Sequence, residues 1–564
     1  MCSRAGLSHA APSRVSLAGL RHAAVPATIA ACAAVALVLR AYQLSRPGYL
    51  LGVTEYDDGV LFGNALRLVS GAIPYRDFAM VQPPGSTLLM APVALLARVT
   101  GTACGLAVAR LLTVCADTAN VVLLGVLVRH RGPVAAGVAC GLYAVYPDAL
   151  VAAHTFLLEP WLNLCCLLGA ILVFDGDGVA GTAARPGLRP GARAAAPDVR
   201  RLALGGAAFG FAVTVKIWAL VPLACNGVLV AITTRVLWPP SRPARVRTSR
   251  ALTGRARPVA AFAGGAALGL GVPLAPFAVL APGGLARGVL VGQLVRDASG
   301  ARDLAGRLAE LAGLVSPPAR VPRPLLLAAI GAAIAVLYAA AYLAAGRRPA
   351  ALDAYALLCA VAVTGMLLWP RLYYPHYGAF DGPFLALAVA LPAGLLAERP
   401  RASSRAARVV GAATLAVAVA AAGAARVRAE SGDRGIQVAA AAGRLIPPGA
   451  CVVTNDSAYT VAAGRFFSGH PGCPAMTDSF GTMIALTSGH PRDASAAVLA
   501  PAAALWQATL EHAAYVWLTG DTVAQIPWNS GLDGYFRRHF RLIGLAGQAT
   551  GWRYVPRPGL YTRD

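Results

Sequence analysis

Eleven apolar segments follow one another along this chain, separated by short loops in which the arginines gather. A helix needs roughly 20 apolar residues to cross a bilayer, and most of these segments approach that length. Only 13% of the 564 residues are charged, against about 25% in an average soluble domain, so a soluble protein of this composition could not cover its exterior. The sequence therefore predicts a polytopic α-helical membrane protein with about eleven transmembrane helices. The segments are 23–39, 104–128, 133–150, 160–174, 202–215, 217–234, 259–281, 324–345, 351–369, 380–396 and 409–425.

The distribution of the arginines predicts an orientation. The 49 basic and 25 acidic residues leave a net charge of +24, which would suit a nucleic-acid partner. The arginines cluster, however, in loops on one side of the predicted membrane, where basic residues mark the cytoplasmic face. We therefore expect a multi-pass protein of the plasma membrane that contacts lipids and no nucleic acid. The prediction comprises a cytoplasmic N-terminus at 1–22, a transmembrane domain at 23–425 with external loops 40–103 and 282–323, and an extracytoplasmic domain at 426–564.

The last segment, 426–564, differs in composition from the rest of the chain. Short β-like runs alternate with Gly, Pro and Asp turns, and a helix is expected to start at Ser457. This pattern predicts a small soluble α/β domain. The β-like runs are Cys451–Thr454, Ala514–Thr519 and Arg541–Leu545.

Two cysteines, Cys451 and Cys473, lie in this extracytoplasmic segment, whereas the other nine lie in the N-terminal segment or in the apolar runs. An oxidising exterior permits a disulfide between the two. The alternative is a pair of free, buried thiols.

Three carboxylates stand within four residues of the first external loop. Glu55, Asp57 and Asp58 repel one another, and near lipid they are costly unless they are paired, bound to a metal or used in chemistry. Alternatively, such a cluster has no function and simply lies in a solvent-exposed loop. The cluster is followed by an amphipathic helix-like segment, by PYRDF and QPPG, and by an apolar segment that could lie along the membrane interface.

This order resembles the first external loop of GT-C-fold glycosyltransferases that use polyprenyl-phosphate-linked sugars, in the branch of protein O-mannosyltransferases and lipid A aminoarabinose transferases (family 39 type). The resemblance extends over most of 23–400 in span order and loop length and is loose in the tail. It implies a membrane enzyme that moves a hexosyl or pentosyl group from a polyprenyl-phosphate donor to a hydroxyl of an extracytoplasmic glycan, protein or lipid, by an inverting single displacement.

The resemblance also implies roles for the carboxylates. Asp57 matches the catalytic carboxylate of the family, which implies that it is the general base for the acceptor hydroxyl. Asp58 stands where the family has Glu, and Asp58 or Glu55 would orient the base or help to hold a divalent metal ion. That ion is the only candidate cofactor, and no metal ligands are assigned beyond these residues.

Two further charged residues lie at predicted outer ends of spans. Glu159 matches a second acidic position of the family, although a Glu ahead of Pro160 also suits the start of a helix through the helix dipole. Lys216 is the only lysine of the chain and is a candidate ligand for the donor phosphate. Alternatively, the Lys216 side chain simply extends to the membrane surface, as lysines at the ends of apolar spans commonly do.

The segment WPRLYYPHYGAF adds Arg371, His376 and Tyr377 as candidate substrate-binding residues, of which the His-Tyr pair resembles the family. The aromatic residues could equally form an interfacial belt. Arg76 of PYRDF is a further candidate. Gln82 departs from the aminoarabinose branch, which has Lys at this position, and puts a phosphate contact from there in doubt.

Other patterns carry less information. DGDG at 175–178 is best interpreted as a loop, and Gly206/Gly210 and Gly265/Gly269 have the small-xxx-small spacing of closely packed helices. The sequence contains no motif of serine hydrolases, zinc proteases or P-loop ATPases. The alternatives to a transferase are a secondary transporter, a polyprenol-linked flippase, or a non-catalytic protein of envelope assembly. Carriers tend to hold their charges near the bilayer midplane and to show inverted repeats, neither of which is evident here.

Overall fold

The computed structural model of the chain describes its transmembrane helices, both external loops in part, and most of the C-terminal domain. The described residues are 17–181, 197–236, 249–294, 303–314, 322–370, 372–397, 405–487, 495–519, 525–544 and 559–563.

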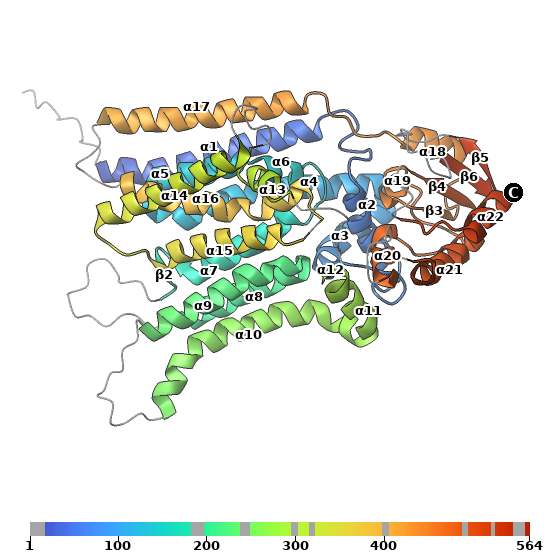
Figure 1. The fold of residues 1–564 in the computed structure, drawn as a ribbon, viewed down its shortest axis with the longest axis horizontal. Coiled ribbons are helices and arrows are strands. Elements are labelled where there is room, and N and C mark those ends of the chain that lie inside the picture. The colour runs from blue at the N-terminus through green and yellow to red at the C-terminus, as the bar shows by residue number, and fades with distance from the viewer. Residues whose placement is uncertain are drawn as a thin grey trace, which may run out of the picture.

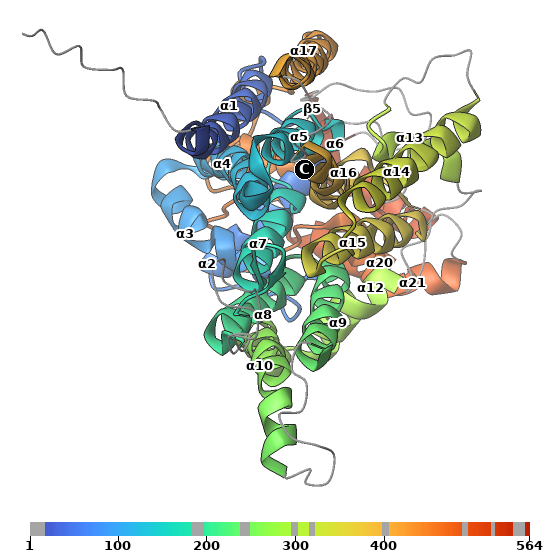
Figure 2. The ribbon, with the colours of Figure 1, turned by 90° about the vertical axis from the view of Figure 1, so that its left-hand side faces the viewer.

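The eleven predicted apolar segments are mostly helical, and their long helices run side by side along the long axis of the molecule (Figure 1). Within the described residues, six segments are long and apolar enough to cross a membrane. The view down the bundle shows them packed around α7 and α16 (Figure 2). The polytopic helical architecture is thus confirmed. The helices are α1 (Leu17–Leu44), α4 (Thr102–Val128), α5 (Gly132–Ala144), α7 (Glu159–Val173), α8 (Val199–Val215), α9 (Leu220–Val236), α10 (Ser249–Leu280), α14 (Arg323–Ala345), α15 (Ala351–Leu368), α16 (Gly382–Ala397) and α17 (Arg405–Glu430).

Two of the predicted segments are interrupted. The segment 133–150 is divided between α5 and the short helix α6 (Pro147–Ala153), because Pro147 lacks the N–H needed to continue α5 and instead starts a new helix. The segment 217–234 begins with a 3₁₀ turn, η2 (Ile217–Ala219), because Lys216 ends α8 in an extended conformation. Lys216 therefore lies at a break between two helices.

Helices α8 and α10 pack backbone against backbone. A Cβ atom on Gly206 would lie 2.0 Å from the carbonyl oxygen of Phe262, and one on Gly265 would lie 1.9 Å from that of Ala203. A side chain at either position would force the helices apart. The small-xxx-small interpretation is therefore correct for these glycines.

A buried polar network joins the first half of the bundle. Arg40, near the C-terminal end of α1, donates to Asp117 on α4 over 2.5 Å, and Tyr143 on α5 donates to the other oxygen of this carboxylate over 2.6 Å. Asn163 on α7 donates to the Tyr143 hydroxyl. These side chains are at most 1% exposed, and each forms a hydrogen bond with a side chain on a neighbouring helix.

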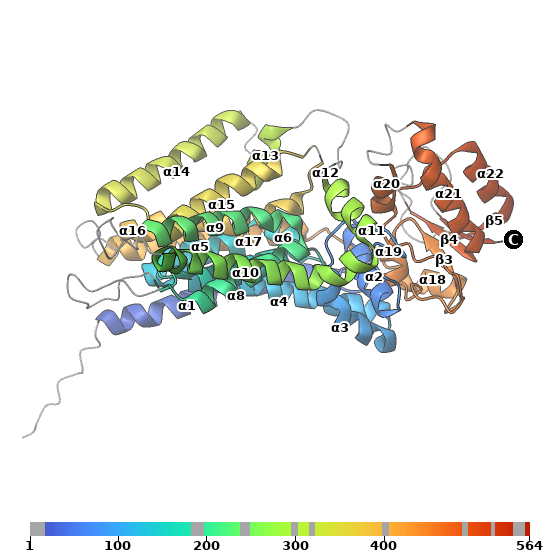
Figure 3. The same cartoon turned by 90° about the horizontal axis from the view of Figure 1, so that it is seen from below.

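Most short helices of the two external loops lie between the bundle and the C-terminal domain (Figures 1 and 3). The first loop forms α2 (Tyr56–Val69) and α3 (Gly85–Thr100), and the second forms α11 (Pro282–Ala286), a π-helical turn η3 (Arg287–Val291), α12 (Gly292–Leu294) and α13 (Leu304–Leu311). Another 3₁₀ segment, η4 (Pro375–Phe380), precedes α16. On the opposite side of the bundle, η1 (Arg129–Arg131) follows α4, and DGDG forms the turn of a small hairpin of β1 (Phe174–Asp175) and β2 (Gly178–Val179).

The C-terminal domain is built on a four-stranded sheet of order β3-β4-β6-β5. The three predicted runs form β3 (Val452–Thr454), β4 (Tyr515–Leu518) and β5 (Phe540–Gly544), and the predicted helix at Ser457 is α19 (Ser457–Ala462). The strand β6 (Gly559–Arg563) was not expected. Strands β3 and β4 are parallel, and β6 is antiparallel to both of its neighbours. The remaining helices are α18 (Ala439–Leu445), α20 (Ser479–Thr487), α21 (Ala496–His512) and α22 (Ser530–His539).

Cys451 and Cys473 form a disulfide with their Cα atoms 5.6 Å apart. It links the start of β3 to the segment that leads into α20. The predicted pairing is confirmed, and the alternative of two free thiols is wrong.

Candidate active site

The carboxylates of the first external loop point in three different directions. All three lie at the start of α2, where Glu55 is the N-cap residue and Asp57 and Asp58 stand in the first turn. The positive end of the helix dipole favours acidic residues there. Because successive residues of a helix are rotated by about 100°, the three side chains contact different neighbours.

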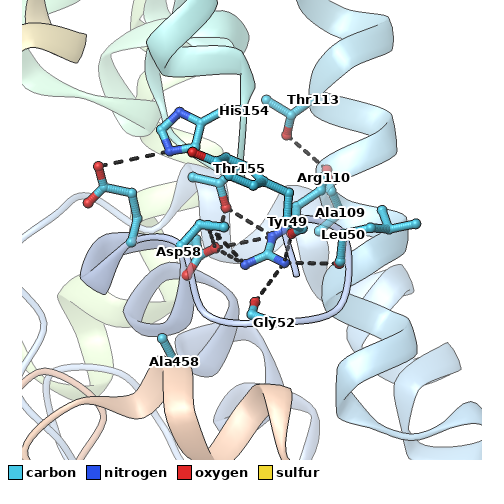
Figure 4. A network of polar contacts seen from close by, with 12 residues as sticks. Tyr49, Leu50, Gly52, Asp58, Ala109, Arg110, Thr113, His154, Thr155 and Ala458 are labelled. Atoms are coloured by element: carbon cyan, nitrogen blue, oxygen red, sulfur yellow. Dashed lines mark hydrogen bonds and ion pairs between the residues drawn. The ribbon is translucent and has the colours of Figure 1, made fainter. Parts of the chain in front are cut away.

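Asp58 points into the protein and is fully buried (Figure 4). One of its oxygens forms an ion pair with Arg110 of α4 and accepts a hydrogen bond from the Thr155 hydroxyl. Arg110 also donates to the carbonyl oxygens of Leu50 and Gly52, each over 2.9 Å. Asp58 and Arg110 thus attach the first loop to the bundle.

Glu55 faces His154, which follows α6, with 4.0 Å between its Oε1 and the imidazole Nε2. The Glu55 side chain is 36% exposed. Partial burial, together with the negative charges of Asp57 and Asp58, raises the pKa of Glu55 to about 7. Burial lowers the pKa of His154 to about 4, so this imidazole is neutral near pH 7.

Asp57 faces a partly open cavity of about 390 Å³, a volume that includes space open to solvent. Its Oδ2 lies 4.0 Å from Nε2 of His376, and its side chain is 38% exposed, in contrast to the buried Asp58. Of the three carboxylates, only Asp57 lines this cavity. The lining residues are Asp57, Val60, Leu61, Val81, Gln82, Leu157, Leu158, Glu159, Lys216, His376, Tyr377 and Asp478.

Lys216 and Glu159 form a buried ion pair in the wall of the cavity. The Nζ of Lys216 lies 2.5 Å from Oε1 of Glu159, and the two residues are 3% and 1% exposed. Lys216 is at the break between α8 and η2, and Glu159 is the first residue of α7. The charged groups are therefore held by the ends of helices rather than by flexible loops.

Aromatic rings enclose the Lys216 ammonium. It lies 3.5 Å from the ring centroid of Trp218 and 4.3 Å from that of Tyr377. The Tyr377 ring also contacts His376 edge to face, at 4.8 Å between centroids. The negative faces of the rings stabilise a cation at this position. Tyr377 and His376 are buried in the protein beside this ammonium, as expected for residues of a binding site.

The C-terminal domain supplies one lining residue that sequence analysis did not single out, Asp478. Its Oδ1 accepts hydrogen bonds from the hydroxyl of Tyr56 over 2.9 Å and from the backbone N–H of Gly481 over 2.6 Å. The available signal was an Asp in a Gly- and Pro-rich segment just after Cys473. Nothing in that pattern relates it to the first loop.

The other predicted site residues lie apart from the cavity or outside the described part of the chain. Arg76 is about half exposed and pairs with its neighbour Asp77. Arg371 lies outside the described residues. Gln82, by contrast, lines the cavity, and its buried side-chain oxygen has no hydrogen-bond partner in the described structure.

The acidic residues do not converge on a metal site. Glu55, Asp57 and Asp58 each face a different partner, namely His154, His376 and Arg110. In the described part of the chain, no three His, Cys, Asp or Glu side chains are grouped so that they could hold a metal ion. These residues therefore do not fit a shared divalent ion, and we derive no step through one.

No family model matches the sequence, and no curated protein matches it. Several solved structures, in contrast, are similar to this chain. The crystal structure of ArnT from Cupriavidus metallidurans in the apo state matches with a TM-score of 0.51 and 15% identity, covering 78% of this chain and 84% of ArnT. The oligosaccharyltransferase AglB from Archaeoglobus fulgidus has a TM-score of 0.47 at 14% identity, with 88% and 69% of the two chains covered. The arabinofuranosyltransferase AftD from Mycobacteria has a TM-score of 0.45 at 17% identity, with 95% of this chain and 39% of AftD covered. The chain thus has the fold of ArnT, which is the GT-C fold that its first external loop predicts.

Proposed function

We propose that this protein is a membrane glycosyltransferase that moves a sugar from a polyprenyl-phosphate donor to the hydroxyl of an extracytoplasmic acceptor. The observation that carries the proposal is the cavity in which Asp57 and the Lys216 ammonium line the same space. Such a reaction needs a base for the acceptor and a cation for the departing phosphate. The fold shared with ArnT, a protein that has also been crystallised with undecaprenyl phosphate, agrees with a lipid-linked donor.

The proposed step is a single displacement. The acceptor oxygen forms a bond to the anomeric carbon while the bond from that carbon to the phosphate oxygen breaks, which inverts the configuration. Asp57 takes the proton of the acceptor hydroxyl as general base. The bonding electrons leave with the polyprenyl phosphate, whose negative charge the Lys216 ammonium stabilises.

Neighbouring residues support these two groups. Glu159 holds the ammonium in place until the donor phosphate approaches it, and His376 lies beside Asp57. Asp58, which does not line the cavity, is assigned a positioning role through Arg110. Arg371 stays a candidate phosphate ligand, whereas the exposed position of Arg76 beside Asp77 gives no support to its predicted role.

The orientation proposed for the chain places the cavity outside the cytoplasm. The first loop, the second loop and the C-terminal domain occupy the same end of the bundle (Figure 1). The described helix ends that border the arginine-rich segments of the sequence lie at the other end of the bundle, which we assign to the cytoplasm together with residues 1–22. Under this assignment 23–425 is the transmembrane domain and 426–564 the extracytoplasmic domain, and a donor in the outer leaflet reaches the cavity from within the bilayer.

The test is sugar transfer in membranes that contain the wild type, Asp57→Asn or Asp77→Asn, with a panel of labelled polyprenyl-phosphate sugars. Asp77 is the matched control, because it lies in the same loop but does not line the cavity. We expect the wild type and the control to consume one donor, and Asp57→Asn to be slower by about 100-fold or more, since it lacks the base.

Two results would contradict the proposal. Equal rates for Asp57→Asn and the wild type would exclude Asp57 as the base and direct attention to Glu159. Consumption of no donor by any of the folded proteins would favour the transporter or assembly alternatives.

A further inference from the structure

A second cavity lies where the first external loop meets the C-terminal domain. It is partly open, with a volume of about 300 Å³ that includes space open to solvent. Its wall combines Arg67 of α2 with apolar and hydroxyl side chains of the C-terminal domain. Among the described residues, it shares no lining residue with the cavity of Asp57 and Lys216, and the function proposed above gives it no task.

Arg67 brings a positive charge into this cavity without an acidic partner. It stands in the last turn of α2, where the negative end of the helix dipole favours a cation. In the described part of the chain no carboxylate forms an ion pair with it, and burial lowers its pKa to about 10. The guanidinium therefore keeps its proton near pH 7, and its charge is not neutralised by the protein around it.

Most N–H groups of the Arg67 guanidinium have no acceptor. A guanidinium carries five N–H donors in a planar fork. The described structure shows one hydrogen bond from it, between Nη2 and the carbonyl oxygen of Pro474 over 3.3 Å, and the buried Nε has no partner. The ring of Phe466, with its centroid 4.4 Å from Cζ, stabilises the charge but offers no oxygen. A carboxylate or a phosphate would supply the missing oxygens in a geometry that matches the fork.

The rest of the wall of the second cavity is uncharged. The hydroxyls of Thr454, Ser457 and Thr460 line it, but each donates its hydrogen to a carbonyl oxygen of the protein. Among the described lining residues none is acidic, whereas several carboxylates line the first cavity. An anion in the second cavity would thus be attracted by Arg67 without the repulsion that it would meet beside Asp57.

We propose that the second cavity binds an anionic group, a carboxylate or a phosphate, through the Arg67 guanidinium. The group belongs to a free anion or to an acidic saccharide outside the cytoplasm, and both offer the same charged oxygens. The bound group would lie between α2 and the C-terminal domain, because both line the cavity. Met476 of its wall stands two residues before Asp478 of the first cavity, so an occupied site borders the segment that completes that cavity. The inference does not depend on the proposed function.

Two variants test the site by different routes. Arg67→Gln removes the charge and keeps a polar side chain. Met476→Glu leaves Arg67 in place but adds a carboxylate to the wall, which would neutralise the guanidinium from within the protein. Arg98→Gln is the matched control, because Arg98 of α3 also donates to a backbone carbonyl oxygen over 3.3 Å but is exposed and does not line the cavity.

The experiment measures binding to the full-length protein near pH 7, in nanodiscs of lipids without net charge and without donor. The probes are labelled inorganic phosphate, a labelled uronic acid oligomer, and an uncharged oligomer of the same length. We expect the wild type and Arg98→Gln to bind an anionic probe, and Arg67→Gln and Met476→Glu to bind it at least about tenfold more weakly. The melting temperature of each protein without probe shows whether the variants are folded.

The anionic probes distinguish the two sources of the ligand. Binding of phosphate alone would support a free anion, and binding of the uronic acid oligomer alone would support an acidic saccharide. The proposal is overturned if the wild type binds neither anion, if it binds the uncharged oligomer as tightly as the acidic one, or if a folded Arg67→Gln or Met476→Glu protein binds the anions as the wild type does. Because no donor is present, failure of the proposed transfer reaction would leave this result unchanged.

Discussion

At the scale of single residues, neighbouring carboxylates of one helical turn have different fates. Asp58 is buried and bonded to Arg110, whereas Asp57, one residue earlier, faces the cavity. A pair of acids that reads as one motif in the sequence is therefore divided in the structure. One member fixes the helix and the other is available for chemistry.

The Arg110 guanidinium provides a test of this division. Arg110→Ala would leave the Asp58 carboxylate buried without its cation and is expected to lower the free energy of unfolding by about 3–5 kcal/mol. The double variant Asp58→Ala/Arg110→Ala should lose less than the sum of the two single changes, because no buried charge remains unpaired. Thermal unfolding in detergent measures both.

The matched control is Arg98→Ala, an exposed arginine of α3, for which we expect a change within about 0.5 kcal/mol. An Arg110→Ala protein that melts with the wild type would show that Asp58 does not depend on this ion pair.

Several residues that line the cavity could be singled out from the sequence because each stands out within its own segment. Asp57, Glu159, Lys216, His376 and Tyr377 were all singled out from the sequence, and all line one cavity. Lys216 is the only lysine, and the others accompany recognisable motifs. Asp478 could not be found in this way, because its relation to Tyr56 spans 422 residues and depends on how the C-terminal domain docks.

At the scale of elements, the helices were predictable because a long apolar segment in a bilayer must satisfy its own backbone hydrogen bonds, and a helix does so. The break at Pro147 results from the missing N–H of proline, and the break at Lys216 results from the extended conformation of this residue. The strand β6 was missed because Pro556 and Pro558 precede Gly559 closely and make the segment read as a loop. In the sheet, β6 lies between β4 and β5 and is hydrogen-bonded to both strands.

The helix α19 offers a prediction about pH. Asp456 is its N-cap residue and accepts a hydrogen bond from the N–H of Ala458 over 2.9 Å. Burial raises the pKa of Asp456 from an ordinary 3.8 to about 7, with smaller contributions from the nearby carboxylates. Between these pH values the folded protein binds more protons than the unfolded chain, so this group makes the folded state less stable as the pH rises from about 4 to 7.

Asp456→Asn keeps a good N-cap and removes this titration. We expect the variant and the wild type to melt at similar temperatures near pH 4, and the variant to melt several degrees higher at pH 8. Melting curves in detergent across this range are the measurement. A difference in melting temperature that does not change with pH would contradict the assignment of the raised pKa to Asp456.

At the scale of the whole molecule, the cavity is assembled from the first external loop, the helix ends of the bundle and the C-terminal domain. The sheet domain is thus part of the cavity and not an independent appendage. Its own integrity depends in part on the disulfide, which connects β3 to the segment leading to Asp478.

Replacement of Cys451 and Cys473 by Ala is therefore expected to destabilise the domain. The linked positions are 22 residues apart, and a cross-link of this length contributes about 3 kcal/mol in the chain-entropy model. Limited proteolysis should then cleave the C-terminal domain at a lower temperature than in the wild type. Cys104→Ala/Cys115→Ala, which changes two exposed free cysteines, is the control, and equal cleavage of both double variants would argue against a stabilising cross-link.

The hydrogen bond between Tyr56 and Asp478 has a consequence for biosynthesis. The ribosome makes the first of these residues more than four hundred residues before the second. A chain that is still being inserted already contains Asp57 and Lys216, but its cavity lacks the wall that Asp478 forms. In the proposed orientation, the cavity is therefore complete only after the end of the chain has crossed to the other side of the membrane.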